Sequence, residues 1–411
     1  MHVVIFEGHR WWSFAPLSLS RPVFSLRCGL STLLEHQIRA LRPTKLTLWV
    51  RPQLVDYCQR EIIPNLPLPV EINKPLGDEL VLLSSGRSVH LQGFDYPPEP
   101  AVVLDELGFV HTALVRMPGL TPKDCLERNA AWLKISELPQ DGPQARLPQY
   151  IWDLTNWNEE LIVADAINLR DEAENHPSGP YHLIHEEDVH IASDAKIEPG
   201  VVLDGSKGPV IIEAGVSVGA NSVLRGPCFI GKYTLVSPLA LIHPGVTIGP
   251  GCKIGGEVAS SIFLANSNKV HDGYVGDSYI GEWVNLGAGT TTSNLKTTYG
   301  PISMRLGAAE IETNRRFLGS MIGDHSKTAI GTRLMCGTYI GYCSLVAGSA
   351  LPPRYIPSFT FWTDKGTEKY RMEKAKEVIG QVLGRRGRSW SKDDETMLQY
   401  AAETAAQIER S

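Results

Sequence analysis

The sequence predicts an α/β chain with three parts: a Rossmann-like domain at residues 1–175, a left-handed parallel β-helix at residues 176–362, and a helical tail at residues 363–411. Short apolar strands alternate with a helix pattern in the first part, and an aliphatic residue recurs every six positions in the second. The third part has charged residues around apolar ones at helical spacing. A chain of 411 residues is too long for one ordinary domain.

The first fifty residues read as strand, loop, helix, strand. Residues 2–6 form a short apolar run, and residues 45–50 form another. Between them, Thr32 and Glu35 make a capping box that opens an amphipathic helix. This order predicts an α/β domain.

The middle of the chain has a period of six residues, which helical heptads cannot produce. In a triangular coil each repeated aliphatic residue points inward, and the glycines that often follow relieve crowding at the corners. The repeated positions are Ile191, Ile197, Leu203, Ile212, Val218, Leu224, Ile230, Val236, Ile242, Ile248, Ile254, Ile280, Leu286, Ile322, Thr328, Leu334, Ile340 and Val346. These residues predict one continuous aliphatic column. A purely structural β-helix without catalysis is the alternative.

The repeat is interrupted at residues 255–279 and 287–321, where the sequence becomes polar and irregular. Loops that leave a rigid scaffold are common places for functional sites. In the tail, we expect one helix at residues 365–383, a basic break at residues 384–388, and a last helix that is capped by Ser391 and Asp394 and runs through Ile408. The basic segment at residues 384–388 is either a solvated linker or a contact for coenzyme phosphates.

Composition excludes several classes of protein. The net charge is −6 without a basic block, so nucleic acid is not an expected partner. Seven cysteines form no close pair, which argues against a disulfide framework and favours a reducing cytoplasm. We expect no membrane span, because no apolar stretch approaches the required length of about 18 residues. We expect no export signal, because the N-terminus lacks a basic region followed by a long apolar one.

The segment at residues 271–294 carries the most specific signal. It contains a histidine, a Tyr-x-Gly-Asp step, and a coil that ends in Asn-x-Gly-Ala-Gly-Thr. This sequence motif resembles the acetyltransferase half of the bacterial bifunctional enzymes that acetylate glucosamine 1-phosphate and couple it to UTP. The matching positions are His271, Tyr274, Gly276, Asp277, Ile280, Gly281, Asn285, Gly287, Ala288, Gly289, Thr290 and Asn294.

The resemblance implies direct transfer of an acetyl group from acetyl-CoA to an amine. An imidazole can take the amine proton near neutral pH, so His271 is the candidate general base. Glu257 occupies the place where the family keeps a glutamate beside its histidine, and we expect it to orient His271. Tyr274 and Asn285 are candidate substrate contacts. The candidate coenzyme and oxyanion positions are Gly287, Ala288, Asn294 and Ala347.

Two cations that the family uses for its sugar phosphate are missing. The sequence has His243 and Ala259 at those places. Because a bound phosphate gains several charge-assisted hydrogen bonds, other cations must replace them or the acceptor differs. The candidate replacements are Lys253, Lys269, Lys296, Arg315 and Arg316.

The N-terminal part resembles the nucleotidyltransferases of sugar phosphates, in a divergent branch. The matching stretches are Ser20-Arg21-Pro22, Leu26-Arg27-Cys28-Gly29, residues 151–158 (IWDLTNWN), residues 323–327 (GDHSK) and residues 352–362. The family's glycine-rich loop is reduced to Gly8, and its metal-binding Gly-Asp reads Ser85-Gly86. The expected nucleotide contacts are therefore Gly8, Arg21 and Lys74, with Mg²⁺ if this half is active.

These features together predict a cytoplasmic, homotrimeric transferase with two activities. It would acetylate an amino-sugar phosphate and couple it to a nucleoside triphosphate, for nucleotide-sugar biosynthesis. The first alternative is an acetyltransferase whose N-terminal domain only senses sugar nucleotides. The second is a zinc hydrolyase of the carbonic anhydrase type with His185, His190 and His243 as ligands.

Overall fold

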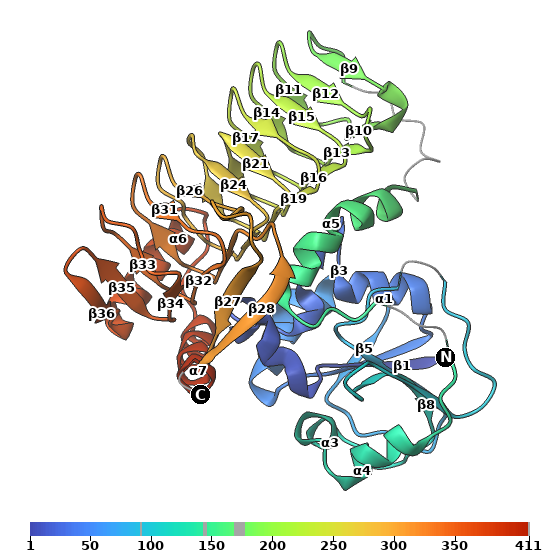
Figure 1. Ribbon diagram of the computed structural model, residues 1–411. Coiled ribbons are helices and arrows are strands. Elements are labelled where there is room, and N and C mark those ends of the chain that lie inside the picture. Colours follow the sequence, from blue (N-terminus) through green and yellow to red (C-terminus); the bar gives the residue numbers. More distant parts are fainter. Residues whose placement is uncertain (91–92, 143–145, 168–176, 410–411) are drawn as a thin grey trace.

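The computed structural model describes residues 1–90, 93–142, 146–167 and 177–409. An N-terminal α/β domain, here called the head, packs beside a long stack of coils (Figure 1). The C-terminal helices lie at the far end of that stack. The predicted boundary between residues 175 and 176 falls outside the described residues. No helix among the described residues is long and apolar enough to cross a membrane.

The head is built on a mixed six-stranded sheet with the order β5-β4-β1-β6-β8-β7. Strands β1, β4, β5 and β6 are parallel, and β8 runs antiparallel to both β6 and β7. The predicted first strand, capping box and second strand are confirmed. The strands are β1 (His2–Phe6), β4 (Lys45–Trp49), β5 (Val70–Ile72), β6 (Val81–Ser85), β7 (Ala101–Leu104) and β8 (Val110–Val115).

Helices and short turns cover this sheet and lead away from it. The α-helices of the head are α1 (Leu33–Leu41), α2 (Val55–Tyr57), α3 (Pro122–Glu127) and α4 (Ala130–Leu133), and the short pair β2 (Arg27–Cys28) and β3 (Ser31–Thr32) precedes α1. Helix α5 (Ile151–Ala166) contains the IWDLTNWN stretch. It lies between the sheet of the head and the coils (Figure 1).

The β-helix has three faces, and its strands stack in parallel along each face. Face one contains β10 (Val189–Ile191), β13 (Val210–Ile212), β16 (Cys228–Ile230), β19 (Val246–Ile248), β22 (Ile262–Phe263), β25 (Tyr279–Ile280), β29 (Ser320–Ile322), β32 (Thr338–Ile340) and β34 (Tyr355–Ile356). Face two contains β11 (Lys196–Ile197), β14 (Ser217–Val218), β17 (Leu235–Val236), β20 (Lys253–Ile254), β23 (Asn268–Lys269), β30 (Lys327–Thr328), β33 (Leu345–Val346) and β35 (Thr360–Thr363). Face three contains β9 (His182–Ile184), β12 (Val202–Asp204), β15 (Val223–Arg225), β18 (Leu241–Ile242), β21 (Glu257–Ala259), β24 (Tyr274–Gly276), β26 (Thr291–Thr292) and β31 (Arg333–Leu334).

The hexad residues form the core of this coil, as predicted. One buried cluster runs from Val189 to Trp362 and contains the repeated aliphatic positions. Ile197 packs against it at the first coils, and the polar hexad residue Thr328 is also buried. The predicted left-handed β-helix and the α/β head are thus confirmed.

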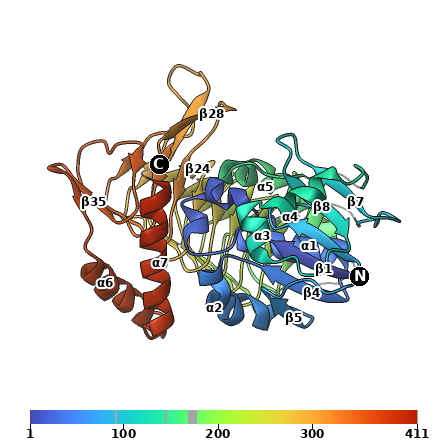
Figure 2. The same ribbon diagram turned by 90° about the horizontal axis from the view of Figure 1, so that it is seen from below.

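Two regions differ from the sequence prediction. The irregular stretch after Leu286 contains an antiparallel hairpin of β27 (Ile302–Leu306) and β28 (Ala309–Arg315), which projects from the coils (Figure 1). The helix expected from residue 365 was wrong at its start, because β36 (Gly366–Lys369) first pairs with β35. Helix α6 (Met372–Gly384) begins after that strand, and α7 (Lys392–Ile408) has the predicted Ser391 cap. Figure 2 shows α7 between α6 and the head.

Candidate functional site

Four of the predicted acetyltransferase residues, His271, Gly287, Ala288 and Ala347, lie along one edge of the β-helix, where face two turns into face three. Asn268, Asn285, Lys327 and Leu345 stack in register on successive coils of face two. His271 lies three residues after Asn268, and Ala288 lies three residues after Asn285, so the two occupy the same corner of neighbouring coils. Gly287 and Ala347 occupy the position just before that corner, and Ala329 lies between them.

His271 is exposed in the single chain. Its backbone carbonyl oxygen accepts a hydrogen bond from a buried lysine. Lys269 is 2% exposed, and its Nζ donates to the carbonyl oxygens of Gly255 (2.7 Å) and His271 (3.0 Å). Burial lowers the pKa of Lys269 to about 8. Lys269 therefore supports the corner that carries His271, and it does not point outward as a phosphate ligand. The role of Lys269 was not visible in the sequence, because its hydrogen-bond acceptors are backbone atoms.

Tyr274, Asn294 and Asp277 form a hydrogen-bonded group just beyond this corner. The Nδ2 of Asn294 donates to the Tyr274 hydroxyl (3.1 Å) and to Oδ2 of Asp277 (2.6 Å). Burial raises the pKa of Tyr274 to about 12 and also raises the pKa of Asp277. The amide of Asn294, expected at the coenzyme, is thus used to hold Tyr274. Asn285 stays exposed on face two.

Glu257 has a different partner from the one predicted. Its Oε1 lies 2.9 Å from Nε2 of His243, which is on the preceding coil of face three. The expected contact of Glu257 with His271, which lies at the corner, stays a prediction. Among the described residues, no group of three His, Cys, Asp or Glu side chains is arranged to hold a metal ion, so His185, His190 and His243 form no zinc site.

Most of the candidate phosphate cations also have other partners. Lys296 donates to the carbonyl oxygen of Pro301 (2.6 Å), and Arg315 donates to Asp153 of the head (2.7 Å). Lys253 and Arg316 are exposed. Face three instead carries a cavity of about 210 Å³ that is lined by Lys207, Arg225, His243 and Asp204 among others. Sequence reasoning missed Lys207 and Arg225 because they precede the recognised motif.

In the head, the carboxyl ends of β1 and β6 meet, and this edge of an α/β sheet is where ligands usually bind. Gly8 and three arginines, Arg10, Arg87 and Arg128, line a cavity of only about 20 Å³ there. The guanidinium of Arg10 donates to Gln149 (2.9 Å), and that of Arg128 lies 4.4 Å from the ring centre of Phe109. The sequence analysis did not identify these three arginines as candidate phosphate contacts. The one signal in the sequence is that Arg10 follows Gly8 by two residues.

The other expected nucleotide contacts lie elsewhere. Lys74 is exposed beyond the end of β5, two strands away from β1. Arg21 is 3% exposed and reaches across to the β-helix, where it donates to Glu282 (2.7 Å) and Asp324 (2.5 Å). The hydroxyl of Ser20 donates to the same Asp324 (2.7 Å). The SRP and GDHSK stretches therefore bind each other and hold the head against the coils.

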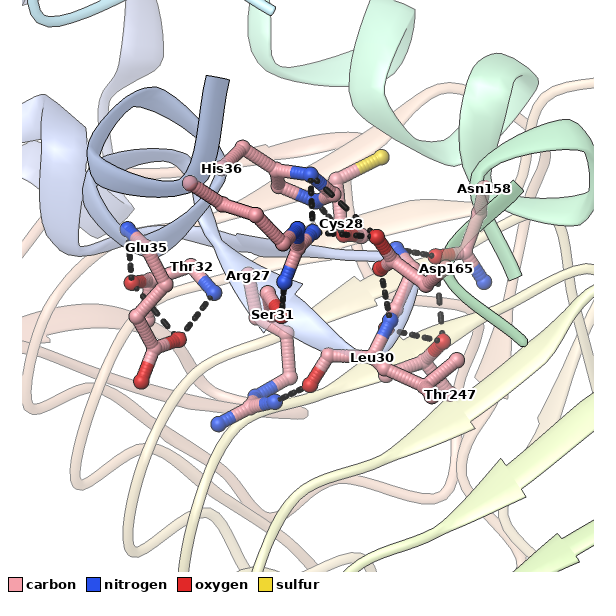
Figure 3. A network of polar contacts seen from close by, with 12 residues as sticks. Arg27, Cys28, Leu30, Ser31, Thr32, Glu35, His36, Asn158, Asp165 and Thr247 are labelled. Carbon is pink, nitrogen blue, oxygen red and sulfur yellow. Dashed lines mark hydrogen bonds and ion pairs between the residues drawn. The ribbon is translucent and has the colours of Figure 1, made fainter. Parts of the chain in front are cut away.

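A second buried contact joins the Leu-Arg-x-Gly stretch to α5 and the β-helix (Figure 3). Asn158 accepts from the backbone N–H of Gly29 (2.7 Å) and donates to the carbonyl oxygen of Gly245 (2.9 Å). Thr247 donates to both Gly29 and Asn158, each at 3.0 Å. Gly29 has a φ of +70°, and a Cβ there would lie 2.7 Å from Oδ2 of Asp165, so this position requires glycine.

Comparisons with known proteins agree with this architecture. A family model described as sugar nucleotidyl transferase matches residues 3–92. The bifunctional sugar-1-phosphate nucleotidylyltransferase/acetyltransferase of Sulfurisphaera tokodaii is 34% identical over 380 residues, which cover 82% of this chain and 93% of that protein. The chain belongs to this family. A similarity over both halves explains why motifs of the head and of the β-helix occur in one chain.

Other relatives of this bifunctional family match over shorter regions. The bifunctional protein GlmU of Methanocaldococcus jannaschii is 40% identical over 168 residues, and that of Methanococcus vannielii is 35% identical over 167 residues. The chain spans about 40% of the length of these two proteins. Among solved structures, a UDP-N-acetylglucosamine acyltransferase matches 57% of this chain and 87% of its own at 16% identity, with a TM-score of 0.24.

Proposed function

We propose that the β-helix is an acetyl-CoA-dependent N-acetyltransferase that acts on an amino-sugar phosphate. The observation that carries the proposal is the shared corner of His271 and Ala288, beside the column of small residues that contains Gly287 and Ala347. A pantetheine chain needs such a row of small side chains to lie close to the backbone. The relative from Sulfurisphaera tokodaii, with acetyltransferase in its name, supports the activity.

In this mechanism His271 takes the proton of the attacking amine as the new N–C bond forms at the thioester carbonyl. The C–S bond then breaks, and the leaving thiolate receives a proton. The N–H of Gly287 already donates to the carbonyl oxygen of Thr328 (3.1 Å), so we assign the oxyanion contact to the N–H of Ala288. Tyr274, held by Asn294, and the exposed Asn285 are the proposed contacts to the sugar.

For the acceptor phosphate, we assign Arg225 and Lys207 in place of the two missing family cations. They line the cavity on face three beside His243, which occupies the position of one missing cation. Adjacent strands are about 4.8 Å apart, so the long Arg225 side chain can reach one coil further along the face.

The proposal predicts a specific loss of turnover in a His271→Ala variant. Acetyl transfer should fall by roughly 10² to 10⁴, because a general base contributes about that much, while the binding of acetyl-CoA stays close to normal. Initial rates with glucosamine 1-phosphate and binding by calorimetry measure both quantities. His185→Ala, which removes another exposed histidine, is the matched control. Unchanged turnover in His271→Ala would remove this residue from the mechanism.

For the head, we propose nucleotidyl transfer as the first candidate function, because the family model and the two-activity name of the Sulfurisphaera tokodaii relative support it. Arg10, Arg87 and Arg128 would then contact the phosphates. The same edge does not fit Mg²⁺, since its carboxylate Asp105 lies 3.7 Å from the guanidinium of Arg87 and Gly86 stands where the family has its aspartate.

A second candidate, a head that binds sugar nucleotide without turnover, is favoured by the cavity of only about 20 Å³ at that edge. An assay of pyrophosphate release separates the two candidates. The wild-type chain is incubated with N-acetylglucosamine 1-phosphate and each of ATP, CTP, GTP, UTP and dTTP. Release with one of them supports nucleotidyl transfer, and no release with any of them leaves the chain an acetyltransferase with a non-catalytic head.

A further inference from the structure

A cavity of about 390 Å³ lies where the head, the β-helix and the C-terminal helices meet. Tyr57 and Asn65 contribute from the head, Trp283 and His325 from the coils, and Trp390 from the loop between α6 and α7. This volume is within the range of about 300–1,000 Å³ that is usual for small-molecule sites. None of the residues assigned above to acetyl transfer or to the phosphates at the head lines it. Arg21, the expected nucleotide contact that does line it, is held by Glu282 and Asp324, so the cavity is a separate site.

The walls of this junction cavity have no net charge. Arg21 is paired with Glu282 and Asp324, and Arg60 is paired with Glu61 and Asp393. The charged lining residues are Arg21, Arg27, Arg60, Arg388, Glu61, Glu282, Asp324 and Asp394, four of each sign. A phosphate or a nucleotide would need an excess of cations here. The cavity therefore favours a neutral ligand.

The same walls combine flat aromatic faces with polar atoms that lack a partner. The ring of His325 is parallel to Trp283, with centroids 6.4 Å apart, and burial lowers the pKa of His325 to about 3, so the imidazole is neutral. Nδ1 of His325 and Nε of Arg21 are buried without a hydrogen-bond partner among the described residues. Such unsatisfied buried atoms are costly, and a bound ligand can satisfy them.

We propose that the junction cavity binds a neutral sugar ring. The C–H face of a hexose is apolar and stacks on an indole, while its hydroxyls both donate and accept and so match walls made of arginines, carboxylates and amides. Trp390 is half-buried and is the aromatic side chain supplied by the tail. Because all three parts contribute, a bound sugar joins them and stabilises their arrangement.

The test is a binding titration of the full chain with N-acetylglucosamine and with glucose, followed by calorimetry and tryptophan fluorescence. Saturable binding is expected, and the thermal midpoint should rise with sugar concentration, because a ligand that binds only the folded state stabilises it. Trp390→Leu should weaken binding at least tenfold, and Trp390→Phe, which keeps a ring, should weaken it less. Trp157→Leu is the control, since Trp157 lies on α5 outside the cavity.

The outcomes separate clearly. Absence of saturable sugar binding, or equal binding by the wild type and Trp390→Leu, would overturn the proposal. The proposal would also be overturned if the neutral sugars did not bind, while UTP or inorganic phosphate bound to the wild type and not to Trp390→Leu. If Trp390→Leu does not fold, Asn65→Ala is the second variant, because Asn65 lines the cavity and its side chain is exposed on a short turn of the head. Binding that Asn65→Ala leaves unchanged would then count against the site.

Discussion

Arg21 belongs to the head, but both of its carboxylate partners belong to the β-helix. Asp324 in turn accepts from Ser20 and from the backbone N–H of Glu282. A buried ion pair of this kind adds little net stability, but removal of one partner leaves a buried charge that costs about 3–5 kcal/mol. The SRP stretch thus fixes how the head sits on the coils, whatever chemistry the head performs.

We therefore predict that Arg21→Met lowers the free energy of unfolding by about 3–5 kcal/mol, because Asp324 and Glu282 lose their counter-charge. The double variant Arg21→Met/Asp324→Asn should lose less than the sum of the single variants. Urea unfolding followed by circular dichroism measures these differences. Exactly additive losses would show that the two side chains are not coupled.

Two buried histidines of the head make its stability depend on pH. His111, on β8, is 2% exposed, and burial lowers its pKa to about 3; burial also lowers the pKa of His90 to about 4. Both are neutral when folded, whereas the unfolded chain takes up protons near pH 6.5. This contribution to stability is therefore complete above pH 6.5 and is lost as the pH falls toward 4.

Between pH 6.5 and 4.5 we predict that the unfolding free energy of the head falls by up to about 1.4 kcal/mol per pH unit for each histidine. Urea unfolding at pH 7, 6 and 5, followed by tryptophan fluorescence, gives the slope. His111→Leu should reduce it, because the variant has one proton fewer to take up on unfolding. The same slope in both proteins would mean that His111 is protonated in the folded head.

At the scale of elements, the coils were predictable because a period of six fixes which side chains point inward, from Ile191 to Val346. The hairpin of β27 and β28 was not, since it lies outside the six-residue period: its register follows from the pairing of its own strands and from the burial of Ile302 and Met304 in a cluster with residues of the head. The pairing of Glu257 with His243 and the support of His271 by Lys269 also escaped prediction. Both are contacts between neighbouring coils, and their partners are fixed by the exact stacking of the chain.

That stacking is tight at Gly287, where a Cβ would lie 2.5 Å from the backbone carbon of Ala329. We predict that Gly287→Ala separates the two coils locally, lowers the unfolding free energy by about 1–3 kcal/mol, and weakens the binding of acetyl-CoA. Thermal unfolding and calorimetry measure the two effects. Gly300→Ala is the matched control, because a Cβ at Gly300 comes no closer than 3.9 Å to another side chain. Equal behaviour of both variants would contradict tight packing at this corner.

For the whole molecule, the position of His271 has a consequence for assembly. The residue is exposed at an edge of a triangular prism, where face two turns into face three. A general base needs the substrate held at hydrogen-bond distance and shielded from water, which one convex edge cannot provide. A second prism placed against this edge would form the missing wall, as in the trimer that the sequence predicts.

We therefore predict that acetyl transfer depends on a trimer. Dilution should lower the specific activity in parallel with the fraction of trimer, because each cleft needs residues from two chains. Sedimentation velocity and initial rates, measured over the same range of protein concentration, give the two curves. Pyrophosphate release, if the head catalyses it, serves as an internal control and should not change, since the carboxyl ends of β1 and β6 lie within one chain. A fully active monomer would require the complete acetyltransferase site to lie on a single edge, with Glu257, Tyr274 and Asn285 as its only wall.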